Sequence, residues 1–364
     1  DGNNLRLCDV QVYPWDPVAE ELNDKIVICD RGIVPLNEKV SNLPYSYRVR
    51  VAGVIIRSTA SSEQSLVEVS YIRPTALISR EDGDALMSWV RDAQAADDTP
   101  KLSIGAAVAK YTPDGADVMA RFSSRGPYAA QPDVMVPHIS APGVDVFAAY
   151  ADEQPFHESN PAPADFSLLS GTSMASPHVA GAAALLRQIH PEWTPAQIQS
   201  AMMLTANTNV TKNDDGAGPV EAGFFDTGSG SLRVDLAAKT GLIMDVPVDD
   251  YKSVSPYADG DYPRLNMPYL SNSRCAGTCT WERTFTATQD GSWSAATEGS
   301  INGVSTSISP ANFDIKAGES ITLKVTANIA QRVSEDWSFL RLALTPAGDS
   351  PELSLPIAIK PMIA

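Results

Sequence analysis

The stretch that decides the fold reads GTSMASPHVAG, at residues 171–181. Gly171 permits a tight backbone that exposes the side chain of Ser173, and the small residues that follow predict a closely packed helix. A serine at a helix N-terminus lies beside N–H groups that can donate to a developing oxyanion. Pro177 is expected in the first turn, where its missing N–H has no helical acceptor. The pattern fits a nucleophilic serine, and it also fits a serine that caps a buried alanine-rich helix.

Residues 1–100 are predicted to form a small α/β unit. Three short apolar segments are expected as strands: residues 25–29, 51–56 and 72–79. The second is continuously apolar, as in buried sheets. Ser79 should cap a helix over residues 80–93, where apolar side chains recur at helical spacing.

The chain changes character twice after residue 100. Residues 101–245 are rich in glycine, alanine and serine, and Thr194–Gln197 has the pattern of a capping box with proline at the first helical position. Residues 246–364 alternate between apolar and polar side chains, with turn-forming residues at short intervals. This pattern predicts a β-sandwich of about seven strands.

The composition is that of a globular protein, because 43% of the 364 residues are hydrophobic and 20% are charged. This length predicts two or three domains. The formal net charge of −17 excludes nucleic acid and anionic membranes as expected partners, since an acidic surface repels both. No apolar run approaches the ~20 residues that span a bilayer. The chain starts at Asp1 without a signal peptide, so we expect a segment to precede it.

The four cysteines are predicted to form two local disulfides, Cys8 with Cys29 and Cys275 with Cys279. Neither pair has the second half of a zinc site nearby, so no metal site is expected. Calcium would suit the acidity of the chain, but no EF-hand-like loop is present, and no cofactor is expected. Disulfides would indicate an oxidising compartment. The alternative is four buried free thiols.

The motif at residues 171–181 resembles the nucleophile motif of the subtilisin-like serine proteases, or subtilases. Further segments resemble the stretches around that nucleophile: residues 122–127, 141–144, 190–206 and 228–238. Cys8 with residues 25–32 and 51–56 resembles the protease-associated domain of the branch that includes cucumisin-type plant enzymes. Residues 265–345 resemble the fibronectin-III-like domain of that branch.

The resemblance implies a multidomain fold of α/β and all-β parts. Residues 1–100 would form a protease-associated α/β domain, and residues 101–245 the C-terminal half of a subtilisin-like α/β domain carrying the nucleophile. Residues 246–364 would form a fibronectin-III-like β-sandwich. The sequence departs from the branch at Val136–His138, where the branch usually has Lys-Pro-Asp, so any contact of that aspartate is absent.

The resemblance also implies a chemistry in which Ser173 is the catalytic nucleophile. Its N–H would hold the oxyanion, with a secondary hydrogen bond from the Thr172 hydroxyl. Subtilases order their triad Asp, His, Ser along the chain. The inserted domain follows the histidine and the oxyanion asparagine, so this chain should contain only the serine. We therefore expect residues 1–364 alone to be inactive.

The four histidines and one aspartate motif are each interpreted as structural. His178 falls within the helix that starts at the motif, and His190 should cap its C-terminus. His138 and His157 are expected in loops. Asp226 opens an Asp-Thr-Gly string like the family's aspartate motif, but it follows the serine, so its order is wrong.

The resemblance implies a secreted, extracellular endopeptidase. Its partners would be protein or peptide substrates and the N-terminal part of the catalytic domain with the aspartate and histidine. The protease-associated domain would either shape the substrate groove or mediate homo-oligomerisation. The alternative is a non-catalytic scaffold that binds proteins. An esterase is set aside because Ala175 stands where its Gly-x-Ser-x-Gly motif needs glycine.

Overall fold

The structure is a computed structural model of the chain. It describes residues 7–32, 34, 36–59, 71–106, 108, 116–150, 165–214, 218–254, 261–329 and 336–362. Contacts within the chain define two compact units. The first unit comprises Asp1–Ala116, Ala120–Phe122 and Val144–Ser170, and the second comprises Asp117–Met119, Ser123–Gly143 and Gly171–Ala364. The three-domain division at residues 100 and 245 stays a prediction.

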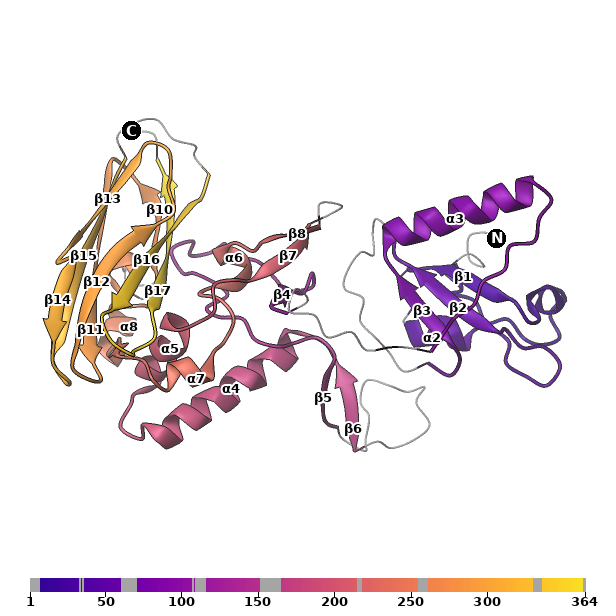
Figure 1. Cartoon of the computed structure of the whole chain (residues 1–364), viewed down its shortest axis with the longest axis horizontal. Coiled ribbons are helices and arrows are strands. Elements are labelled where there is room, and N and C mark those ends of the chain that lie inside the picture. The colour runs from indigo at the N-terminus through magenta and orange to yellow at the C-terminus, as the bar shows by residue number, and fades with distance from the viewer. Residues whose placement is uncertain are drawn as a thin grey trace. The chain divides into compact units, whose positions relative to one another are not determined.

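The first unit is built on a parallel three-stranded sheet in the order β1-β2-β3 (Figure 1). Its strands are β1 (Ile26–Asp30), β2 (Gly53–Arg57) and β3 (Thr75–Ile78). Every residue of the central strand β2 is buried, as its continuous apolar sequence predicts. Helix α3 (Arg80–Ala95) follows β3, and the Ser79 hydroxyl accepts a hydrogen bond from the Asp82 N–H at 3.1 Å, which confirms the predicted cap.

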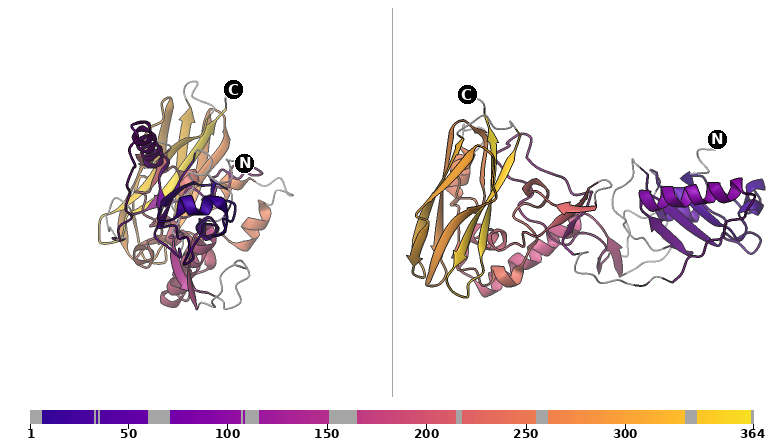
Figure 2. Two further views of the ribbon diagram at one scale, coloured as in Figure 1. Left: turned by 90° about the vertical axis from the view of Figure 1, so that its right-hand side faces the viewer. Right: turned by 45° about the horizontal axis from the view of Figure 1, so that its top comes forward.

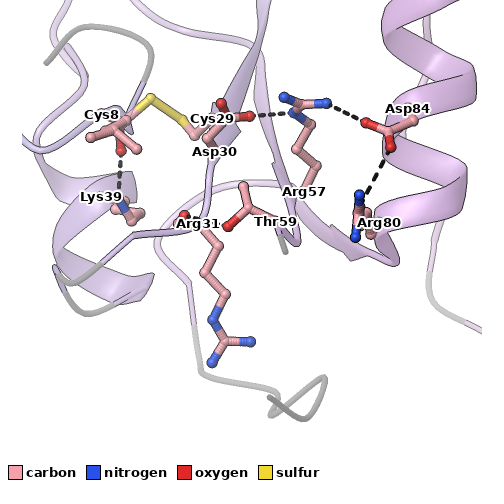
Figure 3. A network of polar contacts seen from close by, with 10 residues as sticks. Cys8, Cys29, Asp30, Arg31, Lys39, Arg57, Thr59, Arg80 and Asp84 are labelled. Carbon is pink, nitrogen blue, oxygen red and sulfur yellow. Dashed lines mark hydrogen bonds and ion pairs between the residues drawn. A yellow bond between two sulfur atoms is a disulfide. The ribbon is translucent and has the colours of Figure 1, made fainter. Parts of the chain in front are cut away.

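A disulfide between Cys8 and Cys29 joins the start of the described chain to β1 (Figure 3). The fully buried ammonium group of Lys39, from α2 (Leu36–Ser41), donates to the Leu7 carbonyl and to the Asp9 carboxylate. These acceptors flank Cys8, so the disulfide and Lys39 fix the same short segment. A short helix, η1 (Pro17–Leu22), lies between this segment and β1.

A row of charged side chains closes the carboxyl end of the sheet (Figure 3). The buried guanidinium of Arg57 pairs with Asp30 at the end of β1 and with Asp84 of α3, the latter at 3.0 Å. Arg80 approaches the other oxygen of Asp84 at 3.7 Å. This row ties α3 to the first two strands, and because each buried charge has a partner, the cost of desolvating it is offset.

The middle of the chain contains helices and short strands that precede and follow Ser173 in the sequence. The helices are α4 (Thr172–Ile189), α5 (Pro195–Leu204), α6 (Phe224–Thr227), α7 (Val234–Ala237) and α8 (Val248–Ser253). The strands are β4 (Val118–Met119), β5 (Val146–Ala149), β6 (Phe166–Leu169), β7 (Thr211–Asp214) and β8 (Gly218–Glu221). Leu186, Trp193 and Ile198 pack α4 against α5. The predicted capping box at Thr194 and Gln197 is confirmed.

The C-terminal part is a β-sandwich whose two sheets are visible as layers (Figure 2). One sheet has the order β10-β17-β16-β12-β14 and the other the order β13-β15-β11-β9. The strands are β9 (Leu242–Ile243), β10 (Leu270–Cys275), β11 (Thr278–Ala287), β12 (Gly291–Glu298), β13 (Val304–Ser309), β14 (Asn312–Ile315), β15 (Ser320–Ile329), β16 (Ser338–Pro346) and β17 (Leu353–Pro361). Buried apolar residues from both sheets form its core, among them Trp281, Phe285 and Leu323.

The prediction of about seven strands is too low. The described part of residues 246–364 forms eight strands, β10 to β17, and β9, which precedes this range, adds a ninth to the two sheets. β9 has two residues and β14 has four, which is too short for an alternating pattern, and β17 is buried along most of its length instead of alternating. No helix in the described part of the chain is long and apolar enough to cross a membrane.

Candidate active site

Ser173 is the second residue of α4, and it is exposed. The helix starts after Gly171, whose carbonyl accepts the N–H groups of Met174 at 2.9 Å and Ala175 at 3.3 Å. The N–H groups of Thr172 and Ser173 precede these and therefore have no acceptor inside the helix. The Ser173 N–H thus points out of the positive end of α4, where an oxyanion would be stabilised.

Gly143 holds the turn that precedes Ser173. The Gly171 N–H donates to the Gly143 carbonyl at 2.8 Å. A Cβ at position 143 would lie 2.8 Å from the Gly171 oxygen and 3.2 Å from the Ala175 Cβ. Because no side chain fits this gap, a glycine is required here, in the segment 141–144 that the sequence singled out.

Asp145 and Ser170 form a pair of hydrogen bonds beside this turn, which no sequence pattern predicted. The Asp145 N–H donates to the Ser170 hydroxyl at 2.8 Å, and that hydroxyl donates back to the Asp145 carboxylate at 3.0 Å. Asp145 has a φ of 48°, a left-handed conformation that aspartate tolerates better than most residues. Ser170 directly precedes Gly171, so this pair of hydrogen bonds limits the motion of the turn before the nucleophile. The one sequence signal that could have indicated this contact is that Asp145 directly follows residues 141–144.

Pro177 lies in the second turn of α4, so its prediction in the first turn is wrong. The helix already starts at Thr172, which makes Pro177 its sixth residue. A residue at this place would normally donate its N–H to the carbonyl of Ser173, four positions earlier. Proline has no N–H, and the Ser173 carbonyl therefore lacks its ordinary helical donor.

His178, in the second turn of α4, and His190, at its C-terminal cap, each make contacts of their own. The Nδ1 of His178 lies 2.9 Å from the Met174 carbonyl, which it reaches as a donor. His190 ends the helix, stacks on Trp193 with 3.8 Å between ring centroids, and places Nε2 3.2 Å from the Ala238 carbonyl. Both rings therefore make structural contacts, as predicted from the sequence.

His138 packs between Gln199 and Tyr269, which fits a structural role. Its Nδ1 lies 3.2 Å from the Gln199 side-chain amide, and its ring stacks near Tyr269 at 6.1 Å. Its Nε2 is buried and has no hydrogen-bond partner among the described residues. Burial lowers the pKa of the imidazole, because the charged form is the more costly to desolvate. The fourth histidine, His157, lies outside the described residues.

Asp226 is a structural carboxylate. It is buried and pairs with Arg125 and with Lys212, the latter at 3.0 Å. It also accepts the Gly223 N–H at 2.9 Å, which caps α6. Its recorded partners are two cationic side chains and a backbone N–H, and none of them is a histidine.

No described histidine is recorded as a hydrogen-bond partner of Ser173. The structure records no hydrogen bond of its Oγ to a described residue, and the three described histidines are engaged elsewhere. The neighbouring Thr172 is exposed, and Met174 is half-buried. The described part of the chain contains no group of three His, Cys, Asp or Glu residues that could hold a metal ion. Both predicted disulfides are present.

Comparison with known proteins connects this geometry to a family. Residues 57–221, which include Ser173, match the subtilase family. Residues 264–359 match a fibronectin type-III domain. The chain belongs to the subtilase family. The subtilase match begins on β2, and the assignment of residues 1–100 to a protease-associated domain stays a prediction.

Plant proteases are among the relatives of this subtilase. It is 36% identical over 238 residues to Subtilisin-like protease SBT1.6 of Arabidopsis thaliana, covering 64% of this chain and 30% of that protein. It is 31% identical over 341 residues to Subtilisin-like protease SBT1.7 of the same plant, covering 86% of this chain and 44% of that protein. The chain therefore spans less than half the length of these relatives.

Proposed function

We propose that this subtilase serves as the nucleophile-bearing part of an extracellular serine endopeptidase, with Ser173 as the nucleophile. The observation that carries the proposal is the place of Ser173. It is exposed at the start of α4, next to N–H groups without helical acceptors, inside the segment that matches the subtilase family. A reactive serine needs this combination of access and oxyanion donors.

The chemistry would follow the serine-protease pattern. Ser173 Oγ would attack the substrate carbonyl carbon while a histidine takes its proton. The carbon–nitrogen bond then breaks, and the histidine returns the proton to the leaving amine. Water releases the acyl group by the same steps in reverse. The Ser173 N–H would hold the oxyanion, and the Thr172 hydroxyl would add a secondary hydrogen bond.

We place the histidine, its orienting aspartate and the oxyanion asparagine in an N-terminal part of the catalytic domain that is not contained in this chain. The contacts of His138, His178 and His190 support this placement, because none of these rings approaches Ser173 Oγ as a recorded partner. The relatives are more than twice as long as the matched part, which leaves room for it. The N-terminal part is then a required partner of this chain.

We also propose that residues 1–100 form a protease-associated domain, and that the protein is secreted. The disulfides Cys8–Cys29 and Cys275–Cys279 support secretion, since such bonds persist in oxidising compartments. The protease-associated domain would either shape the substrate groove or mediate self-association. A cross-linking experiment with and without residues 1–100 separates these two roles.

The test compares two proteins with an unfolded protein substrate and a fluorophosphonate probe. Residues 1–364 alone should show neither turnover nor labelling. The longer gene product that includes the upstream residues should show both. In that product Ser173→Ala should lower turnover by several orders of magnitude, as loss of a triad nucleophile does. Ser176→Ala, on the exposed surface of the same helix, is the matched control and should retain turnover.

Two results would contradict the proposal. Labelling of Ser173 in residues 1–364 with turnover would mean that a local histidine completes the site. Full activity of the longer product after Ser173→Ala would mean that another residue is the nucleophile. A longer product without any turnover would favour the non-catalytic scaffold.

A further inference from the structure

The sequence Asn209-Val210-Thr211 runs from the loop after α5 into the first residue of β7. No other asparagine of the sequence has a serine or threonine two positions after it. This triplet, with any residue but proline in the middle, is the acceptor pattern for N-linked glycans on surface loops of secreted proteins. The triplet by itself is a weak signal, and the exposure and the contacts of the loop decide whether a glycan fits there.

The side chain of Asn209 is exposed, and its amide takes no part in holding the loop. Its backbone N–H donates to the Oδ1 of Asn207 at 3.2 Å. Asn207 in turn donates its Nδ2 to the carboxylate of Asp117 at 2.8 Å. The structure records no hydrogen bond of the Asn209 side chain to a described residue, so a sugar on its Nδ2 would break no recorded contact.

The residues on the C-terminal side of Asn209 are anchored in the fold. Val210 is buried, and its carbonyl accepts the Ala222 N–H at 2.9 Å. The Thr211 N–H donates to the Asp117 carbonyl at 3.0 Å, at the start of β7. The chain therefore holds Asn209 on the surface between fixed neighbours, where a bulky glycan projects into solvent without displacing the core.

We propose that Asn209 is an N-glycosylation site of this protein. In the step, the Nδ2 of Asn209 forms a bond to the anomeric carbon of an N-acetylglucosamine. The donor is a lipid-linked oligosaccharide, in which the bond from that carbon to a pyrophosphate oxygen breaks. The lipid pyrophosphate leaves, and the Nδ2 proton is lost to solvent, so no oxidation or reduction takes place. The proposal rests on the secretion proposed above and not on the role of Ser173.

The experiment uses residues 1–364 expressed behind a secretion signal in a eukaryotic cell, together with a reporter glycoprotein. Secreted and retained chain are both analysed by intact mass, before and after treatment with a peptide N-glycosidase, an amidase that hydrolyses the side-chain amide bond of the glycosylated asparagine. We expect one glycan per chain, and release should leave an aspartate at position 209. Asn209→Gln and Thr211→Ala should each abolish the added mass, whereas Thr211→Ser should retain it.

Asn312→Gln is the matched control, because Asn312 is exposed on β14 and lies outside any acceptor triplet. This variant should carry the glycan as the parent chain does. An unmodified parent chain in cells that glycosylate the reporter would overturn the proposal, and so would a glycan that survives Asn209→Gln. Failure of the peptidase assay leaves these masses unchanged, so the two proposals fail independently.

Discussion

Gly228 lies where the loop after α6 crosses the backbone of His138. It has a φ of 65°, and a Cβ there would lie 2.3 Å from the carbonyl carbon and oxygen of His138. Gly318 also has a positive φ, 81°, but nothing lies within 4 Å of its Cβ position. Substituting Gly318 therefore measures the cost of a left-handed backbone conformation alone, whereas substituting Gly228 adds the cost of a steric clash.

We predict that Gly228→Ala lowers the free energy of unfolding of the second unit by about 3 kcal/mol or more, because His138 must move. Gly318→Ala should cost about 1 kcal/mol, from its left-handed conformation alone. Urea unfolding followed by tryptophan fluorescence measures both. Equal losses in the two variants would show that the crossing at His138 is loose.

The lowered pKa of the buried His138 predicts that the free energy of unfolding depends on pH. Its pKa is lowered in the fold, whereas the unfolded chain binds a proton near the ordinary value of about 6.5. The unfolded state therefore binds more protons between these two pKa values. Stability from this group is fully present above the unfolded pKa and is lost as the pH falls through it toward the folded one.

The groups that face this ring are neutral near pH 7: Gln199 at Nδ1, and Tyr269, whose own pKa burial raises to about 12. We predict that His138→Gln reduces the fall in unfolding free energy between pH 8 and pH 5. His178→Gln, at an exposed position on α4, is the control and should keep the parent's fall. The same fall in all three proteins would assign it to other groups.

The carboxylate of Asp226 stabilises helix α6 as an element. Asp226 caps the helix at Gly223 and compensates the partly buried ammonium of Lys212. We predict that Asp226→Ala costs about 3 kcal/mol, since it leaves that charge without its partner. Arg125→Ala should cost less than about 1 kcal/mol, because the Arg125 side chain is 60% exposed. Thermal unfolding distinguishes the two, and a neutral Asp226→Ala would remove the structural role assigned here.

In the whole molecule, each of the two compact units contains one disulfide that stabilises it. Cys8 and Cys29 are 21 positions apart, and Cys275 and Cys279 are 4 apart. A longer loop restricts the unfolded chain more, so reduction should cost the first unit about 3 kcal/mol and the second about 2 kcal/mol. In the first unit, reduction also loosens the segment that compensates Lys39.

Hydrogen exchange with and without a reductant measures this difference unit by unit. Replacing Cys8 and Cys29 together by alanine should reproduce the loss in the first unit and leave exchange in the sandwich unchanged. Equal protection of the first unit with and without its disulfide would show that its parallel sheet holds it alone.

The sequence by itself determined the features that depend on neighbouring residues. The motif at 171–181 gives the start of α4, Thr194 and Gln197 give the capping box, and alternation gives β11 and β15. Both cysteine pairs follow from their positions. Each of these signals has a short period or spacing, which is why it can be recognised without the fold.

Only the tertiary structure decided the contacts between distant positions. Asp145 meets Ser170 across 25 positions, and Arg125 meets Asp226 across 101. The contacts of His138 and the two-residue strand β9 likewise depend on segments brought together by packing. No periodic pattern marks such pairs, because their stability comes from burial and from hydrogen bonds that exist only once the separate elements have packed.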